Sequence, residues 1–482
     1  MKRILVFVLA GLLLLPAIPA IAGQPGKTRT VEVILLHVND MHAKIDNLGK
    51  LAYLSDSLKR THPYVFLVAA GDNFTGNPVV DMAADKGYPM IDLMNRCGFN
   101  VSAFGNHEFD LGQPTLQKRI RQARFPFICC NFDASGAVLK QPKPYLILKA
   151  GKVHIPLLGI LELNENGIPD SNPDNLKGIV FTDGITTAKE YAWLKTKEGT
   201  FFGLTHLGVD TDTKLADAIP QLDGIIGGHS HTLLEKPVME NGVMIVQAGS
   251  NLRYVGKMTL VFTDGKLTGR SDTLLAMDSL KRSRADLDTL IYHYNHHNKD
   301  LERVLAVAEE PVTGNDELGS LMTDAIASEL KLDFYFQNNG GIRIHQIPKG
   351  NIRVMDVYKV DPFNNQVVVY RMTPEEIKTL IVKAYQRDGS IDLQVAGMKY
   401  TVVTDTNGKV VRLVMTDLSG NSLDPSKTYQ VGMNSYMAAA YRFDHSDPGK
   451  TIYETTEKLL IEYLEQVKNV NYKGVKRAQV SH

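Results

Sequence analysis

The chain has 482 residues, of which 44% are hydrophobic and 22% are charged. This length suggests two or three domains rather than one. The 53 Lys and Arg residues balance the 53 Asp and Glu residues, so the formal net charge is zero. Such a chain has no global field to attract a nucleic-acid polymer or an anionic membrane, although a few local charges could hold a small phosphorylated ligand.

Residues 1–22 have the pattern of a secretory signal peptide. Lys2 and Arg3 give a basic start, an apolar core covers residues 4–15, and Ala20-Ile21-Ala22 is an A-x-A cleavage site. An uncleaved anchor is the competing interpretation, but the apolar stretch is barely long enough to span a bilayer and prolines interrupt its end. No cysteine lies near the site for lipid attachment. We therefore expect a periplasmic or secreted protein with no stable membrane anchor after cleavage.

The three cysteines, Cys97, Cys129 and Cys130, do not make a disulfide framework. Cys129 and Cys130 are neighbours in a strand-like run over residues 125–130, so their side chains should point to opposite faces. One bond to Cys97 and three buried thiols both remain open. Stability must then come mainly from a hydrophobic core, which a chain of this size can supply.

From residue 31 to about residue 269, β-type runs alternate with helical or loop stretches. Strands are expected at residues 31–38, 65–69, 200–205, 224–226 and 243–247. Helices are expected at residues 51–60 and 114–124. This alternation predicts a layered α/β domain, which we place at residues 23–278.

The remainder of the chain predicts a linker and a different α/β domain. Residues 279–304 are charged, free of Gly and Pro, and carry apolar side chains at helical spacing, so we expect a helical linker. The second domain is placed at residues 305–482. It should contain an amphipathic helix at 319–331 and a helix from a capping box at Thr373-Pro374-Glu375-Glu376 to about Tyr385. Strands are expected at residues 398–404, 410–416 and 429–433.

Five short polar clusters, most of them after an apolar β-rich run, lie in the first half of the chain. Ligands at the carboxyl ends of several strands mark the usual active-site position in an α/β sheet. Asp, Asn and His without a cysteine thiolate suggest a pair of divalent cations. The clusters are Asn39-Asp40-Met41-His42, Gly71-Asp72, Gly105-Asn106-His107-Glu108-Phe109-Asp110, Thr205-His206 and Gly228-His229-Ser230-His231.

The residue types suggest how such a centre would work. Asp40 and Asp72 would supply carboxylate oxygens, Asn106 an amide oxygen, and four histidines imidazole nitrogens, namely His42, His206, His229 and His231. A bridging carboxylate is expected between two cations about 3.5–4 Å apart, which together lower the pKa of a shared water and polarise a phosphoryl oxygen. Zn, Mn, Co or Fe would suit these ligands.

A second pair in the same region has the spacing of a proton-handling dyad. Asp110 lies three residues after His107, so it can orient the imidazole and keep it protonated toward a developing charge. Any one of these histidines is more often a structural residue, but several strand ends that all carry such ligands are not expected by chance.

Taken together, these motifs, beginning with His37-Val-Asn-Asp-Met-His42, resemble the secreted bacterial 5′-nucleotidase and UDP-sugar hydrolase family. The resemblance covers essentially the whole mature chain and implies a four-layer α/β/β/α metallophosphoesterase domain with a dimetal site, followed by a substrate-binding domain. It implies that the first metal is held by Asp40, His42, Asp72 and His231, and the second by Asp72, Asn106, His206 and His229. His107 and Asp110 resemble the family's catalytic dyad.

The second half resembles the family's C-terminal nucleotidase domain. Asn338-Asn339-Gly340-Gly341-Ile342-Arg343 resembles a glycine-rich loop whose Arg meets the substrate. Phe363, in Asp361-Pro362-Phe363-Asn364-Asn365, and Tyr436 stand where two aromatic rings would sandwich the base. The implied substrate-binding residues are Asn338, Gly340, Gly341, Arg343, Phe363, Asn365 and Tyr436. Without the resemblance, the residues alone favour a simple turn at Gly340-Gly341 and core positions for Phe363 and Tyr436.

This chain also departs from the family pattern in the second half. Asn339 replaces a glycine and Tyr436 replaces the commoner Phe. Arg442 lies near the place of an acidic contact to the nucleoside. Basic residues that often precede the first helix of this domain are absent around Gly314-Asn315-Asp316. These departures leave the hydrolysis expected and the nucleoside specificity open.

The sequence therefore predicts a metal-dependent phosphohydrolase that acts on nucleoside 5′-monophosphates through a metal-bridging hydroxide. Three alternatives share the metal site: a UDP-sugar or dinucleotide diphosphatase, a 2′,3′-cyclic phosphodiesterase and a sulfur-ester hydrolase. A non-catalytic nucleotide-binding or surface protein is the alternative of a different class. A small-molecule nucleotide is the expected partner, and the protein is expected to be a monomer or weak dimer.

Overall fold

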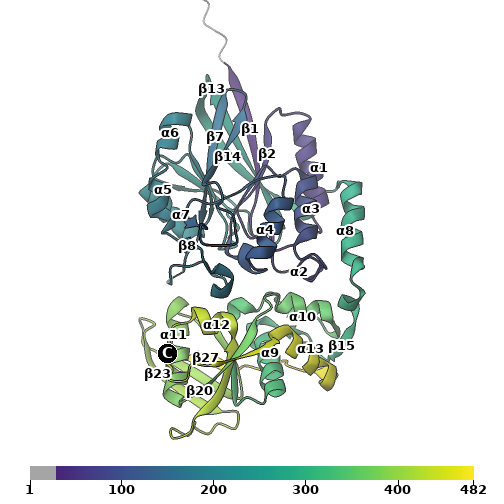
Figure 1. Cartoon of the computed structure of the whole chain (residues 1–482), viewed down its shortest axis with the longest axis vertical. Coiled ribbons are helices and arrows are strands. Elements are labelled where there is room, and N and C mark those ends of the chain that lie inside the picture. Colours follow the sequence, from purple (N-terminus) through teal and green to yellow (C-terminus); the bar gives the residue numbers. More distant parts are fainter. Residues whose placement is uncertain (1–28, 165, 482) are drawn as a thin grey trace, which may run out of the picture.

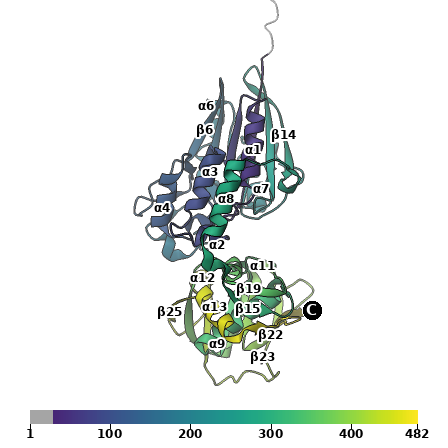
Figure 2. The same cartoon turned by 90° about the vertical axis from the view of Figure 1, so that its right-hand side faces the viewer.

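A computed structural model describes residues 29–164 and 166–481 of the chain. Two α/β bodies lie one above the other along the long axis, and α8 (Ala285–His297) runs down one side between them (Figures 1 and 2). The expected signal peptide lies outside the described residues. Within them, we find no helix that combines the length and the apolar character needed to cross a membrane.

Two six-stranded sheets form the first body, in the orders β14-β13-β1-β2-β3-β4 and β11-β12-β10-β9-β7-β6. In the first sheet, β1 to β4 are parallel and β13 and β14 complete one edge antiparallel. The strands are β1 (Thr30–Val38), β2 (Val65–Ala69), β3 (Val101–Ala103), β4 (Phe127–Ile128), β6 (Tyr145–Ala150), β7 (Val153–Leu161), β9 (Phe202–His206), β10 (Gly224–Ile226), β11 (Val238–Glu240), β12 (Val243–Val246), β13 (Tyr254–Thr263) and β14 (Lys266–Ala276). Short β5 (Phe132–Asp133) and β8 (Val180–Phe181) pair outside the two sheets.

Helices cover the outer face of each sheet, so the first body has four layers (Figure 1). The inner faces pack on each other through buried side chains such as Leu35, Leu157 and Phe262. One outer face is covered by α1 (Leu48–Lys59), α2 (Pro78–Asp81), α3 (Tyr88–Cys97) and α4 (Gln113–Gln122), the other by α5 (Gly184–Lys189), α6 (Trp193–Glu198) and α7 (Val209–Ala218). The expected α/β/β/α layering is confirmed.

The expected strands and helices of this body are present; β2 and β10 have the predicted ends, and the other elements are shifted by up to three residues at an end. The strand-like run over residues 125–130 is an exception, because only Phe127–Ile128 pairs as a strand. Cys97 and Cys129 are buried, Cys130 is partly exposed, and all three are free thiols. The structure therefore shows no disulfide bond between Cys97 and either of the neighbouring cysteines.

The second body is built around a five-stranded sheet in the order β21-β17-β24-β20-β25, with smaller sheets at its sides. Its strands are β15 (Val304–Ala308), β16 (Val312–Thr313), β17 (Phe334–Asn338), β18 (Gln346–Ile347), β19 (Gly350–Arg353), β20 (Gln366–Met372), β21 (Leu393–Ala396), β22 (Met398–Thr404), β23 (Val410–Asp417), β24 (Tyr429–Asn434), β25 (Lys450–Thr455), β26 (Asn469–Val470) and β27 (Ala478–Ser481). Its helices are α9 (Gly314–Leu330), α10 (Val354–Val360), α11 (Pro374–Asp388), α12 (Ser435–Ala440) and α13 (Thr456–Val467).

Two helices of this region show how local chemistry sets a helix start. In α11 the expected capping box is present, with Thr373 and Glu376 exchanging hydrogen bonds. The start of α9 was predicted wrongly, at residue 319. The helix begins at Gly314, because Glu317 accepts a hydrogen bond from the Thr313 amide at 2.7 Å and so stabilises a polar first turn that has no apolar periodicity.

The expected helical linker contains α8 and a short 3₁₀ turn at Lys299–Glu302. Leu287 and Ile291 of α8 are buried in the same core as α1 and α3. Tyr294 donates a hydrogen bond to Asp92 of α3 at 2.9 Å. Helix α8 is thus packed on the first body. Only the short stretch between Tyr294 and the second body lacks these contacts.

Candidate metal and substrate site

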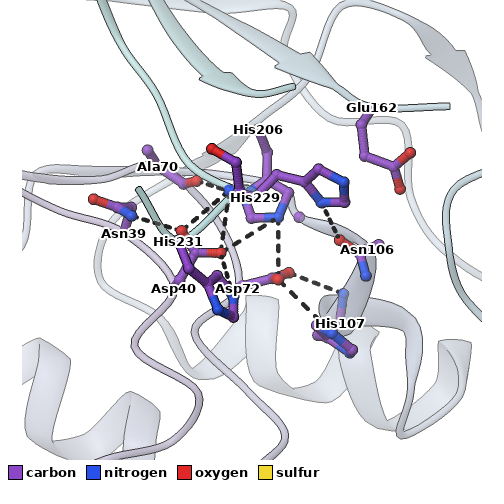
Figure 3. Close-up of polar contacts among 12 residues, drawn as sticks. Asn39, Asp40, Ala70, Asp72, Asn106, His107, Glu162, His206, His229 and His231 are labelled. Carbon is purple, nitrogen blue, oxygen red and sulfur yellow. Dashed lines mark hydrogen bonds and ion pairs between the residues drawn. The ribbon is translucent and has the colours of Figure 1, made fainter. Parts of the chain in front are cut away.

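The five polar clusters come together at the carboxyl ends of five strands (Figure 3). Asp40 follows β1, Asp72 follows β2, Asn106 follows β3, His206 ends β9, and His229 follows β10. Because these strands lie centrally in two sheets that face each other, their ends converge on one point between the layers.

The backbone is strained where these side chains are presented. Among non-glycine residues with positive φ are Asp40 at 48°, His42 at 45°, Asp72 at 52°, His229 at 78° and His231 at 55°. L-residues adopt this conformation at a cost that the surrounding structure must offset, and such residues gather at functional sites. Hydrogen bonds between the clusters hold them, including those from the Asp40 amide to the Gly71 carbonyl (3.1 Å) and from the His42 amide to the Asp72 carbonyl (3.0 Å).

Two overlapping groups of side chains could each hold a cation. In the first, Asp40, His42 and His231 place one ligand atom each within 4.8 Å of one another. In the second, Asp40, Asp72 and His206 do the same, with Nε2 of His206 3.1 Å from Oδ2 of Asp72. Asp40 belongs to both groups, and Asp72 forms a further group with His42 and His107, so each carboxylate is shared; the family resemblance makes Asp72 the bridging ligand.

The contacts inside the cluster fit cations better than they fit hydrogen bonds alone. Nε2 of His42 faces Nε2 of His231 at 2.9 Å. At that distance the two ring nitrogens cannot both carry a proton, so at least one of them presents a lone pair. Nε2 of the buried His206 points at the Asp72 carboxylate 3.1 Å away without making a well-aligned hydrogen bond to it. Convergent nitrogen lone pairs beside carboxylates are the donor set of transition-metal sites.

The charge balance of the cluster points the same way. Burial would lower the pKa of His206, but the carboxylates of Asp72 and Asp40 raise it to about 10. Burial and the nearby charge of His206 lower the pKa of His229 to about 4. The buried carboxylates thus stabilise positive charge at this point, and a divalent cation would supply that charge in place of a proton.

The expected dyad is formed beside this cluster. Nδ1 of His107 lies 2.7 Å from Oδ2 of Asp110, and the His107 amide donates to Oδ1 of Asp72 at 2.9 Å. Burial lowers the pKa of His107, but Asp110 and Asp72 together outweigh it, so the pKa is raised. Because Nδ1 faces Asp110, Nε2 is the atom that His107 can present to a ligand.

The second body contributes one cation to the same place. Nη2 of Arg343 lies 3.2 Å from Nε2 of His42, although the two residues are 301 positions apart. Its guanidinium carbon is also 5.6 Å from the centre of the Phe363 ring, which stacks on the imidazole of His107 at 5.6 Å. Arg343 and Phe363 therefore touch the residues expected to act on phosphate.

A cavity of about 400 Å³ opens between the two bodies at this point. At one end it is lined by expected metal ligands and the His107–Asp110 dyad. At the other end it is lined by all the expected substrate-binding residues, which are Asn338, Gly340, Gly341, Arg343, Phe363, Asn365 and Tyr436. Asp40, His42 and His206 lie deeper and are almost completely buried.

The contacts refine what individual lining residues do. Side-chain Oδ1 of Asn365 accepts hydrogen bonds from the Ser435 hydroxyl at 3.0 Å and from the Tyr436 amide at 3.2 Å, so it fixes the start of α12. A side chain at position 341 would clash, because an added Cβ would lie 2.1 Å from Nε2 of Gln337. Any side chain at this position would therefore displace the amide of the buried Gln337.

Two kinds of site residue were not assigned from the sequence. Glu108 lies inside the Asn106–Phe109 turn, and its carboxylate accepts hydrogen bonds from the amides of Asp72, Asn73 and Gly105. Its place inside a recognised motif was the available signal. Asp170 and Ser171, on the loop after β7, also line the cavity, and no motif or periodicity marked them.

Comparisons with known proteins agree with this architecture. The family model described as calcineurin-like phosphoesterase matches residues 34–233, and the model described as 5′-nucleotidase, C-terminal domain, matches residues 298–443. The two models therefore cover the site-bearing parts of both bodies.

Individual relatives are similar over most of the chain. The 5′-nucleotidase of Vibrio cholerae is 27% identical over 87% of this chain and 86% of its own length. The trifunctional nucleotide phosphoesterase protein YfkN of Bacillus subtilis is 25% identical over 86% of this chain, which spans only 32% of YfkN. The crystal structure of a 5′-nucleotidase precursor from Thermus thermophilus superposes with a TM-score of 0.82 at 25% identity, covering 93% of this chain and 99% of that one. The chain thus belongs to the calcineurin-like phosphoesterases that carry a 5′-nucleotidase C-terminal domain.

Proposed function

We propose that this phosphoesterase releases phosphate from nucleoside 5′-monophosphates. The observation that carries the proposal is the single cavity in which the Asp–His cluster and the His107–Asp110 dyad of the first body face Arg343, Phe363 and Tyr436 of the second. If the phosphate of a nucleoside monophosphate lies at the metal end, its nucleoside lies at the other end. A cavity of about 400 Å³ has room for one such nucleotide.

Two divalent cations are part of the proposal. Asp40, His42, Asp72 and His231 would hold one, and Asp72, Asn106, His206 and His229 the other. When bound, such a pair supplies Lewis-acid charge and an activated water, and Zn, Mn, Co and Fe all suit mixed nitrogen and oxygen ligands. Their number and identity are the parts of the proposal that a metal analysis would test first.

The protein's own residues would act on the phosphoryl group and the leaving oxygen. His107, kept cationic by Asp110, would donate a hydrogen bond from Nε2 toward a phosphoryl oxygen as negative charge develops there. Arg343 would bring a second cation to the same group. Neither residue needs to move far, because both already contact the metal-binding cluster.

The second body would hold the nucleoside. Phe363 and Tyr436 both line the cavity, and flat rings on a purine or pyrimidine give affinity that depends little on the identity of the base. Arg343 is the one arginine or lysine among the lining residues, beside four aspartates. Apart from the two cations and His107, Arg343 is thus the one positive lining group available to further phosphoryl groups, which favours a monophosphate over a di- or triphosphate.

A panel of substrates tests the proposal. Phosphate release from nucleoside 5′-monophosphates should exceed release from a UDP-sugar, NAD, 2′,3′-cyclic nucleotides and an aryl phosphate, each assayed with added phosphomonoesterase and with an EDTA control. Chelator-sensitive activity without that preference would reject the substrate assignment and favour a diphosphatase or phosphodiesterase. Turnover of none of these esters would favour a sulfur-ester hydrolase or a binding protein.

We also propose that the protein is exported to the periplasm or secreted, and that it is a monomer or weak dimer. Export rests on the signal-peptide pattern in residues 1–22. N-terminal sequencing of the protein recovered from the expressing cells should find Gly23 as the first residue. Retention of residues 1–22 would contradict that part of the proposal.

A further inference from the structure

The loop of residues 166–176, called here the interdomain loop, connects to both the dyad and the second body. Ser171 donates a hydrogen bond to Oδ1 of Asp110 at 3.2 Å, and Asn175 donates to the Asp110 carbonyl at 3.2 Å. The Asp170 carbonyl accepts from Nδ2 of Asn106 at 3.0 Å. One loop thus fixes the rotamer of an expected metal ligand and the orientation of the carboxylate that holds His107.

The opposite side of the interdomain loop meets α12, which carries Tyr436. The Tyr436 hydroxyl donates to Oδ1 of Asp170 at 3.2 Å, and Asn166 donates to the Ala440 carbonyl at 3.0 Å. Arg442 donates to the side-chain oxygen of Asn166. These contacts join residues more than 260 positions apart, so they exist only while the two bodies lie together.

Asp170 lies at the centre of these contacts. Its amide donates to Oε1 of Glu162 at 2.7 Å, and Asn164 donates to its carboxylate at 3.0 Å, so the loop side of the contact is held in place. Arg387 of α11 also lies beside the Tyr436 hydroxyl, on the side of the second body. The Tyr436 hydroxyl therefore bonds to the side chain of Asp170, and the backbone carbonyl of Asp170 accepts a hydrogen bond from Asn106.

We propose that Asp170 is a positioning residue that couples the Tyr436 hydroxyl to Asn106 and Asp110. In this arrangement the ring of Tyr436 serves the nucleoside, while its hydroxyl holds the interdomain loop, and the loop holds the dyad and a metal ligand. The inference rests on the proposed function for its kinetic consequence and on the hydrogen bonds alone for its structural consequence.

Tyr436→Phe separates the two roles, because it keeps the ring and removes the hydroxyl. Loss of one hydrogen bond should lower kcat for a nucleoside 5′-monophosphate about two- to tenfold, and KM should change less than about twofold. Tyr441→Phe is the matched control: it also removes a tyrosine hydroxyl at the end of α12, but that hydroxyl bonds to Asp392 within the second body. A higher KM at unchanged kcat in Tyr436→Phe would overturn the proposal, since it would mean that the hydroxyl contacts the substrate.

A double-mutant cycle tests whether the effect passes through Asp170. Asp170→Ala removes the acceptor and keeps the backbone groups that bond to Glu162 and Asn106. The double variant Tyr436→Phe/Asp170→Ala should lose no more kcat than Asp170→Ala alone. If the fold-loss of kcat in the double variant equals the product of the fold-losses in the two single variants, the two residues act independently and the coupling is rejected.

Hydrogen exchange gives a readout that needs no activity. Amides of the interdomain loop should exchange faster in Tyr436→Phe than in the parent protein, and no faster in Tyr441→Phe. Unchanged exchange in Tyr436→Phe would contradict the proposal even if the protein hydrolyses nucleotides. A parent protein without phosphate release would contradict the proposed function instead, and the exchange experiment would then decide the coupling alone.

Discussion

The two ends of the cavity are built by different means. At the metal end, buried side chains follow strands of the two facing sheets, and hydrogen bonds between the clusters hold them on a strained backbone. At the nucleoside end, Phe363 lies on a loop and Tyr436 at a helix start of the second body, and each also contacts the first body. In the proposed function, the metal ligands and the dyad are thus preorganised within one body, whereas the second body completes the substrate cavity.

The sharpest test of the metal end is Asp72→Asn. The Asp72 carboxylate contacts His206 and the His107 amide, so its loss should abolish metal binding and phosphate release together. Asp264→Asn is a matched control, because Asp264 is an exposed hairpin residue with a similar positive φ of 50°. Metal content measured by mass spectrometry, alongside phosphate release, checks this; an active Asp72→Asn protein would show that the cluster is structural.

His107→Ala tests chemistry with the metal ligands in place. Removal of a group that faces developing charge should lower kcat about 10²- to 10⁴-fold while the metal content stays unchanged. The control is His62→Ala, since His62 pairs with Glu32 at 3.3 Å at the other end of β1. Near-parental kcat in His107→Ala would remove the dyad from the mechanism.

Phe363→Ala tests the nucleoside end. Loss of one stacking ring should raise KM for nucleoside 5′-monophosphates about tenfold and leave hydrolysis of a simple aryl phosphate nearly unchanged. Tyr453→Ala, which removes a ring that is 83% exposed, should change neither. Equal losses on both substrates would mean that Phe363 supports His107, on which it stacks, more than it binds the base.

The smallest expected effect concerns the support of the Phe363 loop. Glu457 accepts a hydrogen bond from the Asn364 amide, and Asp361 accepts one from Thr456 at 2.6 Å. Burial raises the pKa of Glu457 to about 8 and that of Asp361 to about 6. Because the pKa of Glu457 is higher in the folded state, its contribution to stability is complete below about pH 4.5 and is lost as the pH rises through about 8.

Glu457→Gln should remove the loss of stability that the parent protein shows as Glu457 ionises. Between about pH 6 and about pH 9, the parent protein should lose about 2–4 °C more in Tm than the variant, the equivalent of ~1 kcal/mol in a domain of this size. Glu454→Gln, at a half-exposed residue nearby that pairs with Lys458, should follow the parent. Parallel Tm profiles for parent and Glu457→Gln would place the Glu457 pKa in its ordinary range.

The difference between the ends also explains what the sequence could predict. The metal end follows short motifs at strand ends, so Asp40, Asp72, Asn106, His206 and His229 were found from local pattern alone, and the structure places them together. Asp170 and Ser171 carry no local pattern, because their roles arise from contacts with Asp110, Asn106 and Tyr436 that only the folded chain creates.

Helix starts show the same limit on a smaller scale. The capping box of α11 was readable because Thr373 and Glu376 have a recognised spacing. The start of α9 was not, because a polar first turn held by Glu317 lacks apolar periodicity.

The most direct test of the central claim is a titration of the chelator-treated, metal-free protein with Mn²⁺ while phosphate release from a nucleoside 5′-monophosphate is followed. We expect no release without metal and a plateau near two equivalents per chain, with the same endpoint for the control Asp264→Asn. Full phosphate release by the metal-free protein in the presence of chelator would contradict it.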